Sequence, residues 1–171
     1  TYYYKNGKTS VEANYNDGLL EGKRTAYFIN GTMSQEGNYK ADKADGYFIN
    51  YYSNGSVSNE GWYVNGDAQG TFIYYDLLGN KSSKVYYLDD QTHGVSEYFH
   101  PNGKPDYTEY YDNAWFKKLV QFDTTGKIIS AAELDKGESK VIFKHFNGKP
   151  YIECYYKNYK LFFFYSFVGI I

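Results

Sequence analysis

Carboxylates that recur at a fixed spacing are the first residues in this sequence that could do chemistry. Glu12, Glu36 and Glu60 follow one another at 24-residue intervals, and Glu153 holds the corresponding position near the end of the chain. An acid/base pair must converge on one bond, with carboxyl groups about 5–10 Å apart on its two sides. Carboxylates that occur once every two strands instead form a row spaced by about 10 Å. We therefore expect a solvated or tyrosine-bonded ladder of carboxylates and no catalytic residue.

The three histidines and the single cysteine offer no further chemistry. His93, His100 and His145 stand in turn or strand-end contexts, and no metal-ligand spacing joins them. Cys154 has no second cysteine for a disulfide or a metal cage. No nucleophile elbow is present, and no helix follows the glycine-rich segments to bind phosphate. The sequence predicts neither an enzyme nor a metal or cofactor site.

Asn-Gly turns are the elements that set the 24-residue spacing. Tyr-Tyr-x-Asn-Gly and its variants recur along the chain, and about seven repeats fill it. The structural turn glycines are Gly7, Gly31, Gly55, Gly79 and Gly103. Asn-Gly between strand-like segments predicts a type I′ hairpin turn, in which both central residues have positive φ. A longer and more varied return turn is expected in each repeat, for example over residues 40–46, 64–70 and 88–94.

Two turns in each 24 residues leave room for two strands and none for a crossover helix. The 23 Tyr and 12 Phe residues also favour pleated, half-buried surfaces. We predict an all-β fold, an elongated antiparallel meander of about seven β-hairpin repeats that forms an open, single-layer, twisted sheet with essentially no helix. A sandwich or barrel closed by curling of the sheet and a parallel β-solenoid are the alternatives.

The repeats predict one domain over residues 1–171. We expect regular repeats over about 2–110, degenerate repeats over about 111–158 and an apolar C-terminal strand or tail over 159–171. Terminal repeats are commonly atypical and act as caps, so the later repeats should bend, twist or form a specialised cap.

The turn register predicts which aromatic rings share a face of the sheet. Tyrosines eight residues after the turn glycines, such as Tyr39 and Tyr63, should lie on the same face as the small residues Gly37 and Gly61. The opposite face should carry a second column of rings together with the carboxylate ladder. This second column is our candidate binding surface: Tyr27, Tyr51, Tyr75 and Phe99.

The charge balance and the apolar C-terminal end bear on partners and location. Eighteen basic and twenty acidic residues give a net charge of −2, so we expect no nucleic-acid binding.

The apolar stretch from Leu161 to Ile171 is shorter than the roughly 20 residues of a membrane-spanning helix, and we expect no transmembrane segment. We interpret it as a closing strand or as a docking element for a partner; a membrane-associated or disordered end is the alternative. The chain begins inside a repeat, at Thr1, so a targeting segment is expected to lie outside it. The sequence is compatible with a location in the cytoplasm or in the cell envelope.

The pattern Tyr-x-x-Asn-Gly-x-x-x-x-Glu-Gly-x-Tyr is complete over residues 27–39 and 51–63. It resembles the bacterial variant of the MORN repeat, and proteins built from such arrays are often grouped as YwqK-type antitoxins. The resemblance covers about residues 2–157 and weakens after Gly103, where Lys118, Leu134 and Lys144 depart from the pattern. It implies an open hairpin-repeat sheet that acts as an interaction scaffold without catalytic residues.

We therefore expect a non-enzymatic protein–protein interaction scaffold, antitoxin-like or part of a larger assembly, with a protein as its partner. The alternative is a glycan- or polymer-binding protein, or a structural cell-envelope protein, that uses an exposed aromatic ladder. A column of Tyr27, Tyr51 and Tyr75 that is exposed and coplanar would favour the alternative. A column covered by neighbouring side chains would favour the scaffold.

Overall fold

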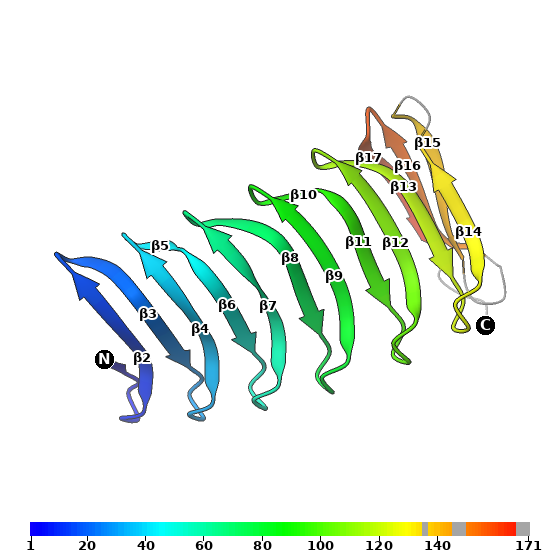
Figure 1. The fold of residues 1–171 in the computed structure, drawn as a ribbon. Coiled ribbons are helices and arrows are strands. Elements are labelled where there is room, and N and C mark those ends of the chain that lie inside the picture. The colour runs from blue at the N-terminus through cyan, green and yellow to red at the C-terminus, as the bar shows by residue number, and fades with distance from the viewer. Residues whose placement is uncertain (135–136, 145–149, 167–171) are drawn as a thin grey trace. The chain divides into compact units, whose positions relative to one another are not determined.

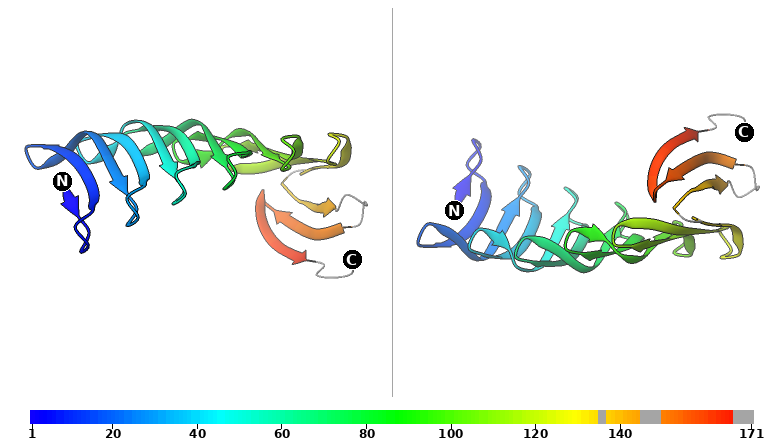
Figure 2. Two further views of the ribbon diagram at one scale, coloured as in Figure 1. Left: turned by 90° about the horizontal axis from the view of Figure 1, so that it is seen from below. Right: turned by 90° about the horizontal axis from the view of Figure 1, so that it is seen from above.

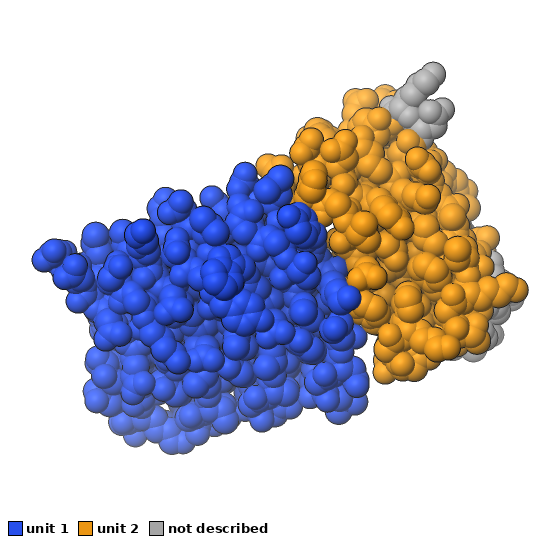
Figure 3. All heavy atoms as spheres, in the orientation of Figure 1, with its two compact units in different colours: residues 1–90 blue, residues 91–171 orange. Residues whose placement is uncertain are grey.

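The structure of this chain is a computed structural model that describes residues 1–134, 137–144 and 150–166 (Figure 1). All 17 elements in these residues are strands, and no helix occurs among them, so the all-β prediction is confirmed. The chain forms two compact units, residues 1–90 and residues 91–171 (Figure 3). His145 and residues 167–171 of the apolar C-terminal stretch lie outside the described residues.

Strands of unit 1 follow one another as a meander, each pairing antiparallel with its neighbours in the order β1-β2-β3-β4-β6-β7-β8-β9, with β5 beside β4. The strands of unit 1 are β1 (Tyr2–Tyr3), β2 (Thr9–Asn16), β3 (Leu19–Tyr27), β4 (Met33–Lys40), β5 (Lys43–Ala44), β6 (Gly46–Tyr51), β7 (Val57–Val64), β8 (Asp67–Tyr75) and β9 (Lys81–Leu88). The predicted open antiparallel meander is therefore confirmed.

Strands of unit 2 form a meander β11-β12-β13-β14 and a separate three-stranded sheet β15-β16-β17. The strands of unit 2 are β10 (Gln91–Thr92), β11 (Gly94–Phe99), β12 (Pro105–Asp112), β13 (Trp115–Phe122), β14 (Ile128–Glu133), β15 (Ser139–Lys144), β16 (Pro150–Lys157) and β17 (Lys160–Ser166). Both views in Figure 2 show β15, β16 and β17 turned back over one face of β12, β13 and β14.

The Asn-Gly tips are not type I′ turns, so that part of the prediction is wrong. At the second tip, Gly31 N–H donates to the Phe28 carbonyl (2.8 Å), and Phe28 N–H donates to the Thr32 carbonyl (2.7 Å). Positive φ is confined to the glycine, at 96°. Asn30 acts through its side chain, because its Oδ1 accepts the Thr32 N–H at 3.0 Å. The tip is a four-residue turn that ends in a left-handed glycine, as in a hairpin with a G1 bulge. The glycine N–H makes the same bond in five more tips, those of Gly7, Gly55, Gly79, Gly103 and Gly126.

The return turns, predicted to be longer and more varied, are the tight two-residue turns. Asn65 and Gly66 have φ values of 54° and 100°, and they connect the paired residues Val64 and Asp67. Positive φ at both central positions is the hallmark of a type I′ turn. Gly70 (φ 77°) lies in the following strand segment, where the register against β7 shifts. The second glycine of the repeat therefore belongs to a β-bulge and not to the turn.

A row of interlocking rings lies on one face of unit 1. Ring centroids of successive residues are 5.0–5.3 Å apart and nearly perpendicular, which is the favoured edge-to-face arrangement. The rings, in order, are Tyr39, Phe48, Tyr63, Phe72 and Tyr87. Buried Gly37 and Gly61 lie against Phe48 and Phe72, so the large rings do lie beside small residues, as the register predicts.

Unit 2 has a second layer and a hydrophobic core. Five buried residues form this core: Phe116, Leu119, Leu134, Val141 and Cys154. Phe116 of β13 stacks on Tyr156 of β16, with ring centroids 4.6 Å apart. The single-layer description therefore applies to unit 1, whereas the meander of unit 2 is covered by β15, β16 and β17.

Candidate interaction surface

The predicted binding tyrosines of unit 1 lie on the face opposite the interlocking rings, and each is half-buried. Each hydroxyl donates to the glutamate fifteen residues earlier: Tyr27 to Glu12 (2.9 Å), Tyr51 to Glu36 (3.1 Å) and Tyr75 to Glu60 (2.7 Å). The rings and the carboxylates therefore share a face, as the register predicts. Phe99, the fourth predicted residue, is half-buried at the end of β11 in unit 2.

These hydrogen bonds hold the tyrosines in their neutral form. The bond to Glu60 and partial burial raise the pKa of Tyr75 to about 12. Lys23 lies 2.8 Å from Glu36 and lowers the pKa of that carboxyl. A protonated tyrosine that donates to a carboxylate is a poor nucleophile, and the carboxylate is a poor base while it accepts that bond. The geometry thus suits a rigid, hydrogen-bonded surface.

A second set of rings on the same face is more exposed, and the sequence analysis missed it. Trp62 lies two residues from Glu60 in β7, and alternate residues of a strand share a face. Tyr47 is paired opposite Trp62, and their ring centroids are 6.2 Å apart with planes inclined at 45°. Exposed fractions are 51% for Trp62, 43% for Tyr47 and 40% for Tyr86. We define the ring patch as five exposed residues: Tyr47, Trp62, Val64, Tyr86 and Leu88.

A signal for the ring patch exists in the sequence. The position seven residues after each turn glycine is Asn14 and Asn38 in the first two repeats and then Trp62 and Tyr86. The predicted binding column, by contrast, is aromatic in each of four repeats, at Tyr27, Tyr51, Tyr75 and Phe99. A column that turns aromatic only in some repeats is a better indicator of a local binding surface, because the scaffold does not require a ring there.

Unit 2 contains a cluster of buried and half-buried polar side chains on β11, β12 and β16. Tyr111 donates to Glu109 at 3.0 Å, and burial raises the pKa of Glu109. Burial likewise raises the pKa of the Cys154 thiol. Ser96 is fully buried, and its hydroxyl has no hydrogen-bond partner within the described part of the chain. No group of three or more His, Cys, Asp or Glu residues suited to a metal ion occurs in residues 1–134, 137–144 and 150–166.

The two described histidines, His93 and His100, each contact the backbone of the following repeat. Asn113 N–H lies 3.3 Å from His93 Nδ1. His100 Nε2 lies 3.3 Å from the Phe122 carbonyl oxygen. The apolar stretch that begins at Leu161 forms β17 as far as Ser166. Within the described ranges, no helix is long and apolar enough to cross a membrane.

Comparison with known proteins follows the repeat pattern. The family model of the MORN repeat variant matches residues 1–17, 20–41, 92–113 and 138–158, which supports a MORN-repeat protein. No curated protein matches the sequence of this chain. Among the solved structures that match is the crystal structure of accessory secretory protein 1,2 and 3 in Streptococcus pneumoniae, at 14% identity over 66% of this chain. The match spans 19% of that chain with a TM-score of 0.24, and at this score it supports no inference about function.

Proposed function

We propose that this chain is a non-enzymatic interaction scaffold that binds a protein partner through the ring patch of unit 1. The observation that carries the proposal is the exposure of Tyr47, Trp62 and Tyr86 on one sheet face, at 43%, 51% and 40%. MORN repeats generally mediate the binding of proteins or membrane lipids. Trp and Tyr are enriched among the residues that dominate protein–protein binding energies, because they bury a large area and lose little conformational freedom.

The neighbouring Tyr–Glu ladder supports this role by keeping the face rigid. Tyr51 and Tyr75 are fixed by bonds to Glu36 and Glu60, so little side-chain entropy is lost there when a partner binds. One carboxylate of the ladder, Glu36, is also held by a 2.8 Å ion pair with Lys23. The exposed rings would therefore supply the affinity, and the ladder would supply a preorganised border.

An antitoxin-like role is a narrower form of the same proposal. The partner would then be a toxin protein, and the rings would cover part of its surface. A part in a larger assembly is the other form, and in that case the partner would be a structural protein. Both forms require a stoichiometric protein partner and the same rings.

The test is an affinity capture from the source cells with identification by mass spectrometry. We compare the wild-type chain with a patch variant that carries Tyr47→Ser, Trp62→Ser and Tyr86→Ser. A matched control carries Ile29→Ser, Leu77→Ser and Leu78→Ser, which alters three exposed apolar residues at hairpin tips. We expect the wild type and the control to retain a stoichiometric protein that the patch variant loses. Recovery of polysaccharide alone, or equal retention of the protein by the patch variant, would contradict the proposal.

Glycan binding is the second candidate, and the exposed ring of Trp62 is the observation in its favour. Sugar rings stack best on a flat row of aromatic faces. The 45° inclination between Tyr47 and Trp62 and the half-buried state of Tyr27, Tyr51 and Tyr75 give this candidate less support. Binding of the same variants to immobilised polysaccharides separates the two candidates.

A further inference from the structure

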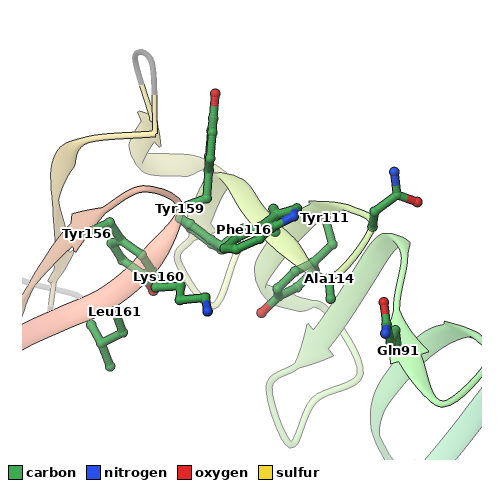
Figure 4. A pocket seen from close by; sticks show the side chains of 10 residues that line it. Gln91, Tyr111, Ala114, Phe116, Tyr156, Tyr159, Lys160 and Leu161 are labelled. Carbon is green, nitrogen blue, oxygen red and sulfur yellow. The ribbon is translucent and has the colours of Figure 1, made fainter.

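Unit 2 contains a pocket that plays no part in the proposed scaffold function (Figure 4). Its volume is about 530 Å³, which lies within the usual range of sites for small organic molecules, about 300–1,000 Å³. Aromatic side chains make up much of its wall, among them Tyr111, Trp115, Phe116 and Tyr156. Such a lining suits an apolar ligand that carries a small number of polar groups.

Two tight turns bring the walls of the pocket together. The turn Asn113–Ala114 joins β12 to β13, and the turn Asn158–Tyr159 joins β16 to β17; all four residues have φ between 48° and 63°. The stacked rings of Phe116 and Tyr156 connect the two sheets beside the pocket. The pocket is therefore preformed by packed strands and short turns, so little ordering is needed when a ligand binds.

Lys160 gives the pocket its charge. No acidic residue lines the pocket, and Lys160 is its one cationic lining residue within the described part of the chain. The Lys160 ammonium lies 5.1 Å from the centre of the Trp115 ring. No ion pair joins Lys160 to a carboxylate of the described residues. A second cation would be repelled by this ammonium, whereas an anion would be attracted.

We propose that this pocket binds an apolar carboxylate, a small molecule of one or two rings that carries a single carboxylate group. The rings would lie against Trp115 and the ring of Tyr111, whose hydroxyl is already bonded to Glu109. The carboxylate would accept a hydrogen bond from the Lys160 ammonium, the one cation that lines the pocket within the described part of the chain. Charge complementarity favours the carboxylate over a neutral analogue of the same shape.

Naphthylacetate and its uncharged analogue naphthylacetamide test the proposal by titration into the full ¹⁵N-labelled chain. The chain has two tryptophans, so the indole N–H signal of Trp115 reports on the pocket while that of Trp62 in unit 1 is an internal control. We expect naphthylacetate to shift the Trp115 signal with a dissociation constant of about 1 mM or tighter. Because Lys160 is exposed, the amide should bind only about fivefold more weakly.

Lysine variants complete the test. We expect Lys160→Gln to weaken naphthylacetate binding about fivefold and to remove the preference over the amide, while Lys160→Arg retains that preference. Lys118→Gln is the matched control, because Lys118 also lies near an aromatic ring of unit 2, at 5.6 Å from Tyr110, but does not line the pocket. Unchanged thermal midpoints establish that the variants remain folded.

Three results would overturn the proposal: equal affinity for the acid and the amide, an equal shift of the Trp62 signal, or an equal loss of affinity in Lys118→Gln. Failure here is distinguishable from failure of the scaffold function. The patch variant of Tyr47, Trp62 and Tyr86 should bind naphthylacetate as the wild type does, because its substitutions lie in unit 1.

Discussion

At the scale of single residues, Gly61 packs against the Phe72 ring so closely that no Cβ atom fits between them. A Cβ atom added to Gly61 would lie 2.3 Å from Phe72 Cδ1, and the ring is buried in the interlocking row. We predict that Gly61→Ala lowers the free energy of unfolding by about 2 kcal/mol, because overpacking forces the ring from its position. Urea denaturation of the full chain measures this difference.

A second substitution identifies the cause. In a Phe72→Leu background the smaller side chain can yield, so Gly61→Ala should cost less there than in the wild type. Gly55→Ala is the control: its Cβ would meet open space, but its φ of 90° strains an alanine. Its cost should be the same in both backgrounds. Equal costs of Gly61→Ala in the two backgrounds would show that the ring contact is not responsible.

The tyrosine–glutamate bonds make stability depend on alkaline pH. The pKa of Tyr75 is raised to about 12 by its bond to Glu60 and by burial, whereas an unfolded tyrosine titrates near 10. Between these values the unfolded chain releases a proton that the folded chain retains. The stabilisation is therefore complete below about pH 10 and is lost as the pH rises towards about 12.

We predict that Tyr75→Phe reduces this alkaline loss. The measurement compares unfolding free energies of the wild type and the variant at about pH 9 and about pH 11. Tyr3→Phe, at a tyrosine that is 65% exposed, serves as the control and should leave the loss unchanged. If Tyr75→Phe lost as much stability at alkaline pH as the wild type, titratable groups other than Tyr75 would be responsible for the loss.

At the scale of the elements, the sequence revealed where the chain turns but not which kind of turn it makes. Asn-Gly is compatible with a type I′ turn and with a left-handed glycine that follows an asparagine bonded to the backbone. Side-chain bonds and strand pairing decide between them, and these are not local properties. The return turn Ala41–Asp42 has positive φ at both residues without any glycine. Asp42 is held there by the Leu20 N–H, which donates to its carboxylate at 2.7 Å.

Replacing a non-glycine residue that has positive φ in a tight turn, such as Ala114, should stabilise the chain. Ala114 has a φ of 63°, a conformation that costs an alanine about 1 kcal/mol and a glycine much less. Ala114→Gly should raise the free energy of unfolding by about 0.5–1 kcal/mol, as measured by urea denaturation. Ala131→Gly, in strand β14, is the control and should lower it by a similar amount. Destabilisation by Ala114→Gly would mean that the alanine methyl group contributes more than the relief of strain.

At the scale of the whole molecule, the repeat period was sufficient for the fold class because each pair of turns dictates an antiparallel hairpin. It was not sufficient for the second layer of unit 2. There the column that holds Phe48 and Phe72 in unit 1 holds Ser96, and the column of Gly37 and Gly61 holds Glu109. The interlocking row therefore has no ring at that point. Covering strands must be inferred from long-range packing, which a repeat pattern does not encode.

The overall charge of the chain predicts that it does not bind nucleic acid. Eighteen basic and twenty acidic residues provide no excess of positive charge, and nucleic-acid affinity depends largely on the release of counterions by such an excess. We predict no saturable binding of a labelled single-stranded oligonucleotide at about 50 mM salt, measured by fluorescence anisotropy. The exposed rings of the ring patch are the one feature that could oppose this outcome, because bases stack on aromatic side chains.

Binding that weakens steeply with salt and persists in the patch variant would contradict the charge argument. Salt-insensitive binding that the patch variant loses would instead assign stacking to Tyr47, Trp62 and Tyr86.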